Sequence, residues 1–253
     1  MTIRRPAILT ASLLVIGLLA GCVQFHSETT IDKNGGGTAV ITMSMSKAVS
    51  DAVKQMQSMD PQGSPGGEMP SFEDIDRAEL EKRVKEFGVK VTKFEKGEVD
   101  GRETMSIAYE FKDMKGLSAA MGAVMSGGDS DQNGLGIFDA GDGNLVLRSA
   151  SYDLPDWSAD EEADAETESP SANPEDMGKQ MELMGTLMGA LSELDVTMKI
   201  TVPGDIVSTS APQHEGRTSI WTINSSNMMT AGQDMEPEIV FSGKGLNIKP
   251  QTE

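Results

Sequence analysis

The stretch Leu194-Asp195-Val196-Thr197-Met198-Lys199-Ile200-Thr201-Val202 decides the fold class. Apolar and polar residues alternate strictly along it. Because successive side chains of a β-strand point to opposite faces, the alternation predicts a strand with one buried and one hydrated face. Two earlier stretches, 39–45 and 105–111, show the same period of two. We therefore expect a sheet that is open to water on one side.

Helical patterns lie between these predicted strands. Apolar residues at helical spacing predict helices that begin at Ser46 and at Ser71, and a shorter helix over 117–124. Asn34-Gly35 predicts a tight turn that closes a first hairpin. Short connections of this kind indicate an α+β fold: an antiparallel sheet of hairpins packed with several helices, with Gly-rich and acidic loops.

The first 21 residues have the pattern of a secretory signal peptide. Arg4 and Arg5 are followed by an uncharged run over 7–20. This run is too short to cross a hydrocarbon layer of about 30 Å as a helix. We expect residues 1–21 to be a cleaved leader and residues 22–253 to be one extracytoplasmic α+β domain.

Cys22, the only cysteine of the chain, follows this leader directly. The stretch Leu19-Ala20-Gly21-Cys22 resembles the lipobox of bacterial lipoprotein precursors. The resemblance implies that the Cys22 thiol carries a diacylglyceryl group and that the leader is cut before it, with the new amino group often acylated too, for example with palmitate. An ordinary secretory signal with a chance cysteine is the alternative.

The same resemblance implies a location. The protein would be anchored by acylated Cys22 to a bilayer of the bacterial cell envelope, outside the cytoplasm. Val23 stands where an aspartate often marks retention in the inner membrane of Gram-negative bacteria. We therefore expect the outer membrane in such an organism, and otherwise the outer face of the plasma membrane.

The charge of the chain limits its partners. Removal of the leader with its two arginines takes the formal net charge from −19 to −21. Such a charge opposes binding to nucleic acid and to anionic headgroups, so membrane attachment would come from the acyl chains. Ten acidic residues and no lysine or arginine occur over 153–176. Because this segment repels itself, we expect a flexible acidic insertion over 155–174.

A second resemblance concerns the domain itself. The hairpin after Cys22 and the stretch Val202-Pro203-Gly204-Asp205-Ile206-Val207, followed by Gly216 and Ile220-Trp221, are similar to LppM-like bacterial lipoproteins. This resemblance implies an α+β extracytoplasmic domain without an established enzymatic activity, for which lipid binding has been considered. The long acidic insertion departs from it.

One short motif has oxygen ligands at the spacing of a calcium loop. Asp129, Asp131 and Asn133 occupy its positions 1, 3 and 5, and Gly134 occupies position 6. Ala140 stands at position 12, where an EF-hand has its bidentate glutamate. The motif is equally typical of a polar turn. Calcium at these residues is the one metal that the sequence suggests, and no other cofactor is indicated.

A methionine-rich helix is predicted after the acidic segment. Its apolar positions are Met177, Met181, Met184, Met188 and Leu191, with Gly185 and Gly189 at small-residue spacing. This stripe could bind a lipid or a protein partner, since methionine adapts to varied apolar surfaces, or it could face the core.

No catalytic motif is apparent. His26 and His214 are the only histidines, and neither lies in a triad or nucleophile-elbow pattern. We expect a membrane-anchored, non-enzymatic lipoprotein that binds an apolar or lipid ligand. The alternatives are a structural or assembly partner of other envelope proteins and, more remotely, a calcium-binding envelope protein.

Overall fold

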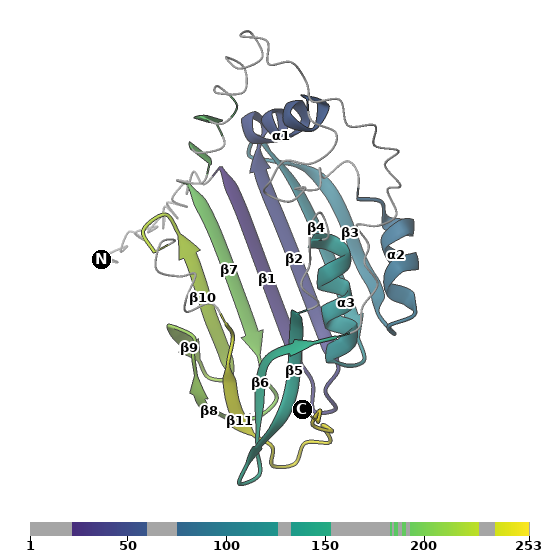
Figure 1. Ribbon diagram of the computed structural model, residues 1–253, viewed down its shortest axis with the longest axis vertical. Helices are drawn as coiled ribbons and strands as arrows, with labels where there is room; N and C mark the ends of the chain where they lie inside the picture. Colours follow the sequence, from purple (N-terminus) through teal and green to yellow (C-terminus); the bar gives the residue numbers. More distant parts are fainter. Residues whose placement is uncertain are drawn as a thin grey trace, which may run out of the picture.

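The computed structural model describes residues 22–59, 75–125, 133–152, 183, 185–186, 189–190, 193–227 and 236–252. They form an α+β fold, as the alternating sequence predicts (Figure 1). Its helices are α1 (Lys47–Met59), α2 (Arg77–Lys85) and α3 (Met114–Met125). Its strands belong to two sheets.

The larger sheet has seven strands in the order β3-β4-β2-β1-β7-β10-β9. Its first hairpin is closed by a turn in which Gly35 has a φ of 89°, a conformation that favours glycine. The strands are β1 (Val23–Ile31), β2 (Gly37–Ser46), β3 (Lys90–Val99), β4 (Arg102–Phe111), β7 (Leu194–Thr201), β9 (Gln213–Glu215) and β10 (Thr218–Asn224).

The sheets are mostly antiparallel, as expected, but the central strand pair is parallel, which the sequence did not indicate. β1 pairs with β7 in parallel, from Val23 opposite Leu194 to Thr30 opposite Thr201. All other pairs between strands are antiparallel. Hairpin patterns in the sequence show local pairing only, and the segment between β1 and β7 is long enough for a crossover to a parallel neighbour.

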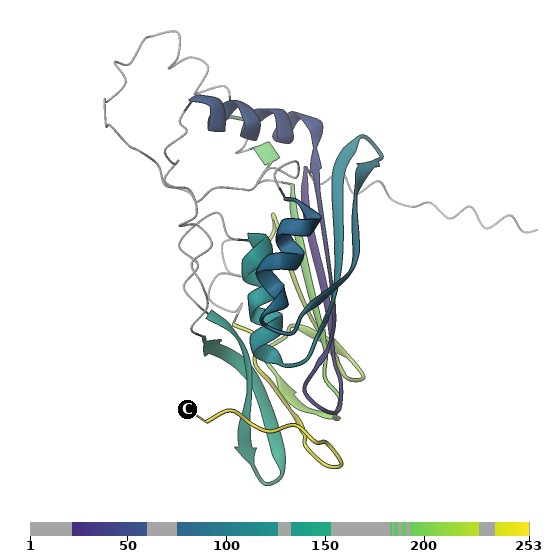
Figure 2. The same cartoon turned by 90° about the vertical axis from the view of Figure 1, so that its right-hand side faces the viewer.

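Helices α2 and α3 cover one face of the seven-stranded sheet, here called the inner face, and leave the opposite, outer face open (Figure 2). The core lies between this face and α3, with Met105, Ile107 and Tyr109 of β4 buried in it. The outer face carries polar pairs such as Thr42–Ser106. The alternation along each strand therefore decides which residues reach the core.

A second sheet lies on the same side as α2 and α3, toward the end of the first sheet that holds the β1–β2 turn (Figures 1 and 2). Its order is β5-β6-β11-β8. The strands are β5 (Asn133–Gly141), β6 (Asn144–Ser151), β8 (Ile206–Thr209) and β11 (Ile239–Ser242).

The segment from Gly127 to Gly143, which reads as a loop in sequence, is partly a strand. β5 occupies most of its second half and pairs with β6 from Asn133 opposite Ser151 onward. The glycines interrupt the apolar alternation there, so the sequence indicates only a brief pairing at 136–138, and the strand extends beyond it. Gly136 is needed where β5 meets its neighbours, since a Cβ at this position would overlap the side chains of Gln251 and Ala150.

The chain after β11 ties the two sheets together. The backbone N–H of Asn247 donates to the carbonyl of Lys33 in the β1–β2 turn, at 2.8 Å. Farther along, the N–H of Gln251 donates to the carbonyl of Ile137 in β5, also at 2.8 Å. This C-terminal segment therefore contacts both sheets through backbone hydrogen bonds.

The start of α2 differs from the expected helix start at Ser71. Asp76 is the N-cap, and its carboxylate accepts from the backbone N–H groups of Ala78 and Glu79. Ser71 lies outside the described residues, as do the leader 1–21 and the acidic insertion 155–174. Among the helices of the described chain, none is both long and apolar enough to span a membrane.

Candidate functional site

The residue expected to carry the lipid lies at one end of the central strand. Cys22 directly precedes β1, and its carbonyl accepts a hydrogen bond of 2.8 Å from the backbone N–H of Ser46, the last residue of β2. The Cys22 thiol donates to a carboxylate oxygen of Glu193 at 3.1 Å. Glu193 in turn directly precedes β7. Cys22 is thus fixed where three segments meet, and we call this the Cys22 end of the sheet.

The environment of the Cys22 thiol favours its protonated form. The hydrogen bond to Glu193 raises the pKa of the thiol, and burial raises it further, while Ser46 acts in the opposite direction. Since the thiolate is the nucleophilic form of cysteine, this environment does not activate Cys22 for catalysis.

Helix α1 begins immediately after Ser46 and lies across the Cys22 end (Figure 1). The Ser46 hydroxyl accepts from the backbone N–H of Val49 at 3.4 Å, a cap that the sequence predicted. Val49 and Val53, four residues apart on the helix, are buried. The helix therefore packs one side against the core.

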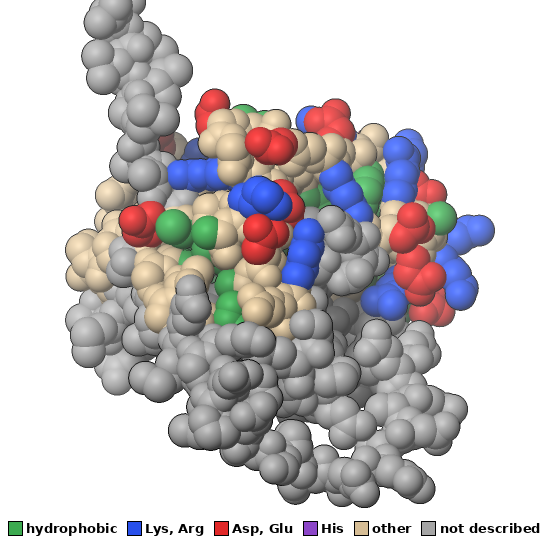
Figure 3. Space-filling model, turned by 90° about the horizontal axis from the view of Figure 1, so that it is seen from above, with side chains coloured by type: hydrophobic (Ala, Val, Ile, Leu, Met, Phe, Trp, Pro, Cys, Tyr) green, Lys and Arg blue, Asp and Glu red, His purple; other side chains and the backbone are tan. Residues whose placement is uncertain are grey.

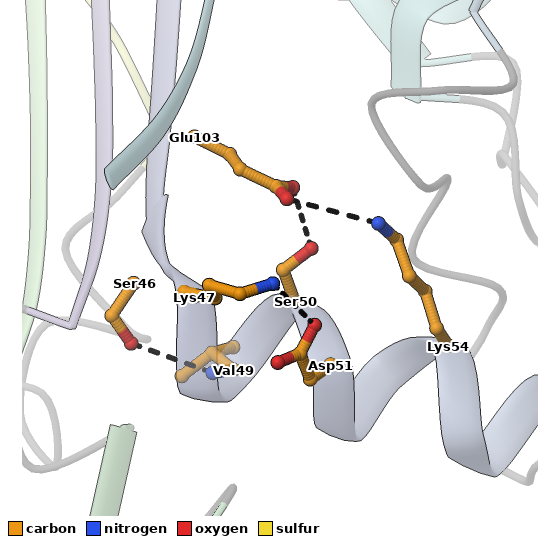
Figure 4. Close-up of polar contacts among 7 residues, drawn as sticks. All are labelled: Ser46, Lys47, Val49, Ser50, Asp51, Lys54 and Glu103. Carbon is orange, nitrogen blue, oxygen red and sulfur yellow. Dashed lines mark hydrogen bonds and ion pairs between the residues drawn. The ribbon is translucent and has the colours of Figure 1, made fainter. Parts of the chain in front are cut away.

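Glu103 of β4 fastens α1 to the sheet, and this contact was not anticipated from sequence. Ser50 donates to Glu103 at 2.5 Å, and the Lys54 ammonium lies 3.7 Å from the same carboxylate (Figure 4). Ser50 is only 3% exposed, so its hydroxyl is closed to a substrate. The cluster resembles a serine–carboxylate pair, but its burial supports a role in holding the helix.

On the inner face near the Cys22 end, several apolar residues are half-buried, beside Met45, which is buried at 6% exposure. Phe25 of β1 lies between Met43 of β2 and Val196 of β7, and all of them are half-buried. Farther along the same strands, Ile41 and Ile200 are fully buried. We call the half-buried apolar residues the proximal apolar patch; its members are Val23, Phe25, Met43, Leu194, Val196, Met198 and Ile223.

A buried polar atom marks the inner limit of this patch. Trp221 of β10 stands opposite Met198 and is 2% exposed, and its Nε1–H has no hydrogen-bond partner in the described chain. The hydroxyl of Tyr109, on the same face, also has no hydrogen-bond partner in the described chain. Burial raises the pKa of Tyr109, so this hydroxyl stays neutral. Unpaired donors inside a protein cost free energy unless something satisfies them.

The proposed calcium residues are not brought together by the described structure. Asp129 and Asp131 lie outside the described residues, and Asn133 begins β5. The Asp139 carboxylate nearby accepts from the N–H of Gly141 at 2.8 Å. In the part of the chain that the structure describes, His, Cys, Asp and Glu form no group of three or more able to hold a metal ion. Calcium binding stays a prediction.

The five apolar positions of the predicted methionine-rich helix, from Met177 to Leu191, lie outside the described residues. Within that segment Leu183 and Ala190 are buried, whereas Gly185 and Gly189 are exposed. A Cβ at either glycine would meet no heavy atom within 4 Å, so no described neighbour requires the small residues.

The two histidines are far from any arrangement for acid–base chemistry. His26 lies on the outer face of β1, opposite Thr42 and Thr197. His214 is exposed on the edge strand β9. Among the described residues, neither imidazole forms a hydrogen bond with a carboxylate.

Comparison with known proteins gives little beyond this geometry. Neither a family model nor a curated protein matches the chain. Among solved structures, the folded domain of LppM from Mycobacterium tuberculosis, determined by NMR, is similar at a TM-score of 0.39 and 11% sequence identity. The similarity covers 87% of this chain and 90% of that domain. It is a weak structural neighbour.

Proposed function

We propose that this protein is a lipid-anchored, extracytoplasmic protein of the bacterial cell envelope that binds an apolar ligand, such as a lipid acyl chain, without catalysis. The proximal apolar patch supports this function more than any other feature. It places contiguous half-buried apolar side chains on the sheet face that elsewhere forms a closed core.

The position of Cys22 supports the anchor. Its side chain is only partly buried. Because Cys22 precedes β1 at one end of the sheet, an acyl group on the sulfur could extend out of the domain without passing through the core. The preceding Leu19-Ala20-Gly21 and the apolar leader supply the signal for acylation. Two or three acyl chains hold a protein at a bilayer far more firmly than a single one does.

The composition of the patch supports the ligand. Met43 and Met198 are flexible and polarisable, so they adapt to apolar ligands of varied shape. Binding sites for small apolar molecules are typically lined by such residues and include few polar groups. The Nε1–H of Trp221 would provide one polar group next to Met198, where a ligand oxygen could accept its hydrogen bond.

Ligand binding can be tested by native mass spectrometry of the full-length protein purified from membranes in mild detergent. A Met198→Glu variant places a charge in the patch and is expected to lose co-purified lipid at least tenfold. The matched control is Thr197→Glu, one residue earlier on β7 but on the outer face, which should keep its lipid. Equal lipid content in the Met198→Glu and unaltered proteins would contradict the proposal.

Anchoring needs a separate test. Cells fed an alkyne analogue of palmitate should label the unaltered protein, and Cys22→Ser should abolish both the label and the cut before residue 22. A normally processed, membrane-bound Cys22→Ser protein would disprove the anchor. If native spectra show bound protein in place of lipid, and Met198→Glu releases it, the patch serves assembly with another envelope protein.

A further inference from the structure

No linker separates the proposed anchor from the folded domain. Cys22 is followed at once by Val23, the first residue of β1, and its own carbonyl is bonded to Ser46. A flexible linker of many residues would allow the domain to tumble above the bilayer. Here the direction of the acyl chains relative to the strands is set by the sheet itself.

The surface around Cys22 is polar and holds charges of both signs. Viewed from this end, Lys and Arg side chains are interspersed with Asp and Glu (Figure 3). Lys47 and Asp51, both exposed on α1, form an ion pair of 3.1 Å. At the β3–β4 turn, the acidic residues Glu98 and Asp100 are exposed on either side of the apolar Val99, which is 57% exposed. Such a surface matches the charged headgroup layer of a bilayer and not its hydrocarbon core.

From this geometry we infer that the domain stands end-on on its bilayer, with the exposed side of α1 and the β3–β4 turn against the lipid headgroups. The inference rests on the proposed acylation of Cys22. In this orientation the strands run away from the membrane, and the ten residues of β2 span about 30 Å at about 3.3 Å per residue. The β1–β2 turn at Lys33 then lies at the end of the larger sheet that is farthest from the membrane.

This orientation has a consequence for ligand binding. Val23 and Leu194 of the proximal apolar patch are opposite each other and directly follow Cys22 and Glu193. The patch would thus begin at the membrane surface, so its ligand class would be the acyl chain of a bilayer lipid and not an apolar molecule dissolved in water. The polar outer face would remain in water along its whole length.

The orientation can be measured with fluorescent labels on single cysteines. Because Cys22 is the only native cysteine and acylation consumes its thiol, each introduced cysteine is the sole labelling site. Three exposed positions mark different parts of the domain: Ala48→Cys on α1, Val40→Cys on the outer face and Lys33→Cys in the far turn. Asp51→Cys supplies a second site on α1.

The lipidated full-length protein, labelled at one position, is reconstituted into phosphatidylcholine vesicles with and without a headgroup-attached nitroxide quencher. We expect the labels at Ala48 and Asp51 to lose at least half of their emission and those at Val40 and Lys33 to keep theirs. Quenching at Val40 equal to that at Ala48 would show a side-on domain, and equal quenching at all sites would show free tumbling; either result overturns the inference.

This experiment separates the orientation from the anchor. If the labelled protein fails to float with the vesicles, or a Cys22→Ser variant floats equally well, the proposed acylation is wrong and the orientation falls with it. If flotation depends on Cys22 but the quenching pattern differs from the expected one, the anchor stands and only the orientation is wrong.

Discussion

The thiol of Cys22 donates a hydrogen bond of 3.1 Å to Glu193, a residue 171 positions away in the sequence. The two residues precede β1 and β7, whose parallel pairing brings them to the same end of the sheet. The proposed anchor is therefore tied to the centre of the fold and not to a loose terminus.

The contact between Cys22 and Glu193 predicts the reactivity of the unlipidated thiol. In a chain expressed without its leader, the midpoint of the alkylation rate against pH should lie above the ordinary cysteine value of 9.0, because Glu193 raises the pKa. Glu193→Gln removes the carboxylate, so the midpoint should fall and alkylation at pH 8 should accelerate. Iodoacetamide labelling followed by mass spectrometry measures both.

A matched control for this prediction is Glu215→Gln, an exposed carboxylate on β9. It should leave the alkylation midpoint unchanged. An identical midpoint in the unaltered and Glu193→Gln proteins would mean that the hydrogen bond does not persist in solution.

Glu103 should contribute measurably to stability. Glu103→Ala leaves the hydroxyl of Ser50 buried without its acceptor and removes the ion pair between Glu103 and Lys54. We expect the free energy of unfolding to fall by about 1–3 kcal/mol, the usual cost of an unsatisfied buried polar group. Urea titration followed by circular dichroism gives the value.

The exposed pair on α1 provides the comparison for Glu103. Asp51→Ala removes an ion pair of 3.1 Å that is open to solvent, and such pairs contribute about 0–1 kcal/mol. If Asp51→Ala lowers the free energy of unfolding as much as Glu103→Ala does, the burial of Ser50 does not explain the stabilising effect of the Glu103 contact.

Tyr109 should make the protein sensitive to alkaline pH. Burial raises its pKa in the folded state, so ionisation above about pH 10, the ordinary value, favours the unfolded chain. Its contribution to stability is complete below that pH and declines above it, by up to about 1.4 kcal/mol per pH unit. Tyr109→Phe should remove this part of the decline in unfolding free energy with pH, measured by urea titrations between pH 9.5 and 11.

The same substitution tests the unpaired hydroxyl. Because Tyr109→Phe deletes a buried oxygen that has no partner in the described chain, it should raise stability at pH 7 by up to about 1 kcal/mol. A clear loss of stability at pH 7 would instead indicate that a ligand or buried water satisfies the hydroxyl.

Gly204 is expected to tolerate no side chain. A Cβ at this position would overlap the backbone carbonyl of Ser242 at the end of β11, so Gly204→Ala must displace one of the two segments. We expect a loss of about 1–3 kcal/mol in unfolding free energy, as for other overpacked sites. Gly97→Ala on β3 is the control, since its Cβ meets nothing within 4 Å, and equal losses in both would refute the steric explanation.

Local patterns in the sequence identified much of the fold. The alternation of 105–111 predicted β4 with the correct buried face, and that of 194–202 predicted β7, where Ile200 and Val202 are buried. Ser46 was correctly expected to cap α1. In contrast, the start of α2 at Asp76 was missed, and the strand β5 was recognisable only over 136–138. An aspartate close to the expected start offered a competing cap, and the glycines of β5 concealed its alternation.

The candidate site was harder to predict from local sequence patterns than the fold was. Cys22 was recognisable because its leader is a contiguous pattern, whereas Glu103 and Glu193 gain their roles only from residues far away in sequence. The half-burial of Phe25 and Val196 likewise depends on what covers the inner face, and alternation alone predicts only which face they occupy.

The sequence by itself therefore determined most of the strands, the face of each that turns inward, the acidic charge and the single cysteine, because each follows from neighbouring residues and the period of the backbone. Only the tertiary structure decided that β1 and β7 run parallel, that Cys22 meets Glu193, and that the apolar patch lies beside the anchor. Those relationships depend on chain segments more than a hundred residues apart, and local periodicity carries no information about which of them pair.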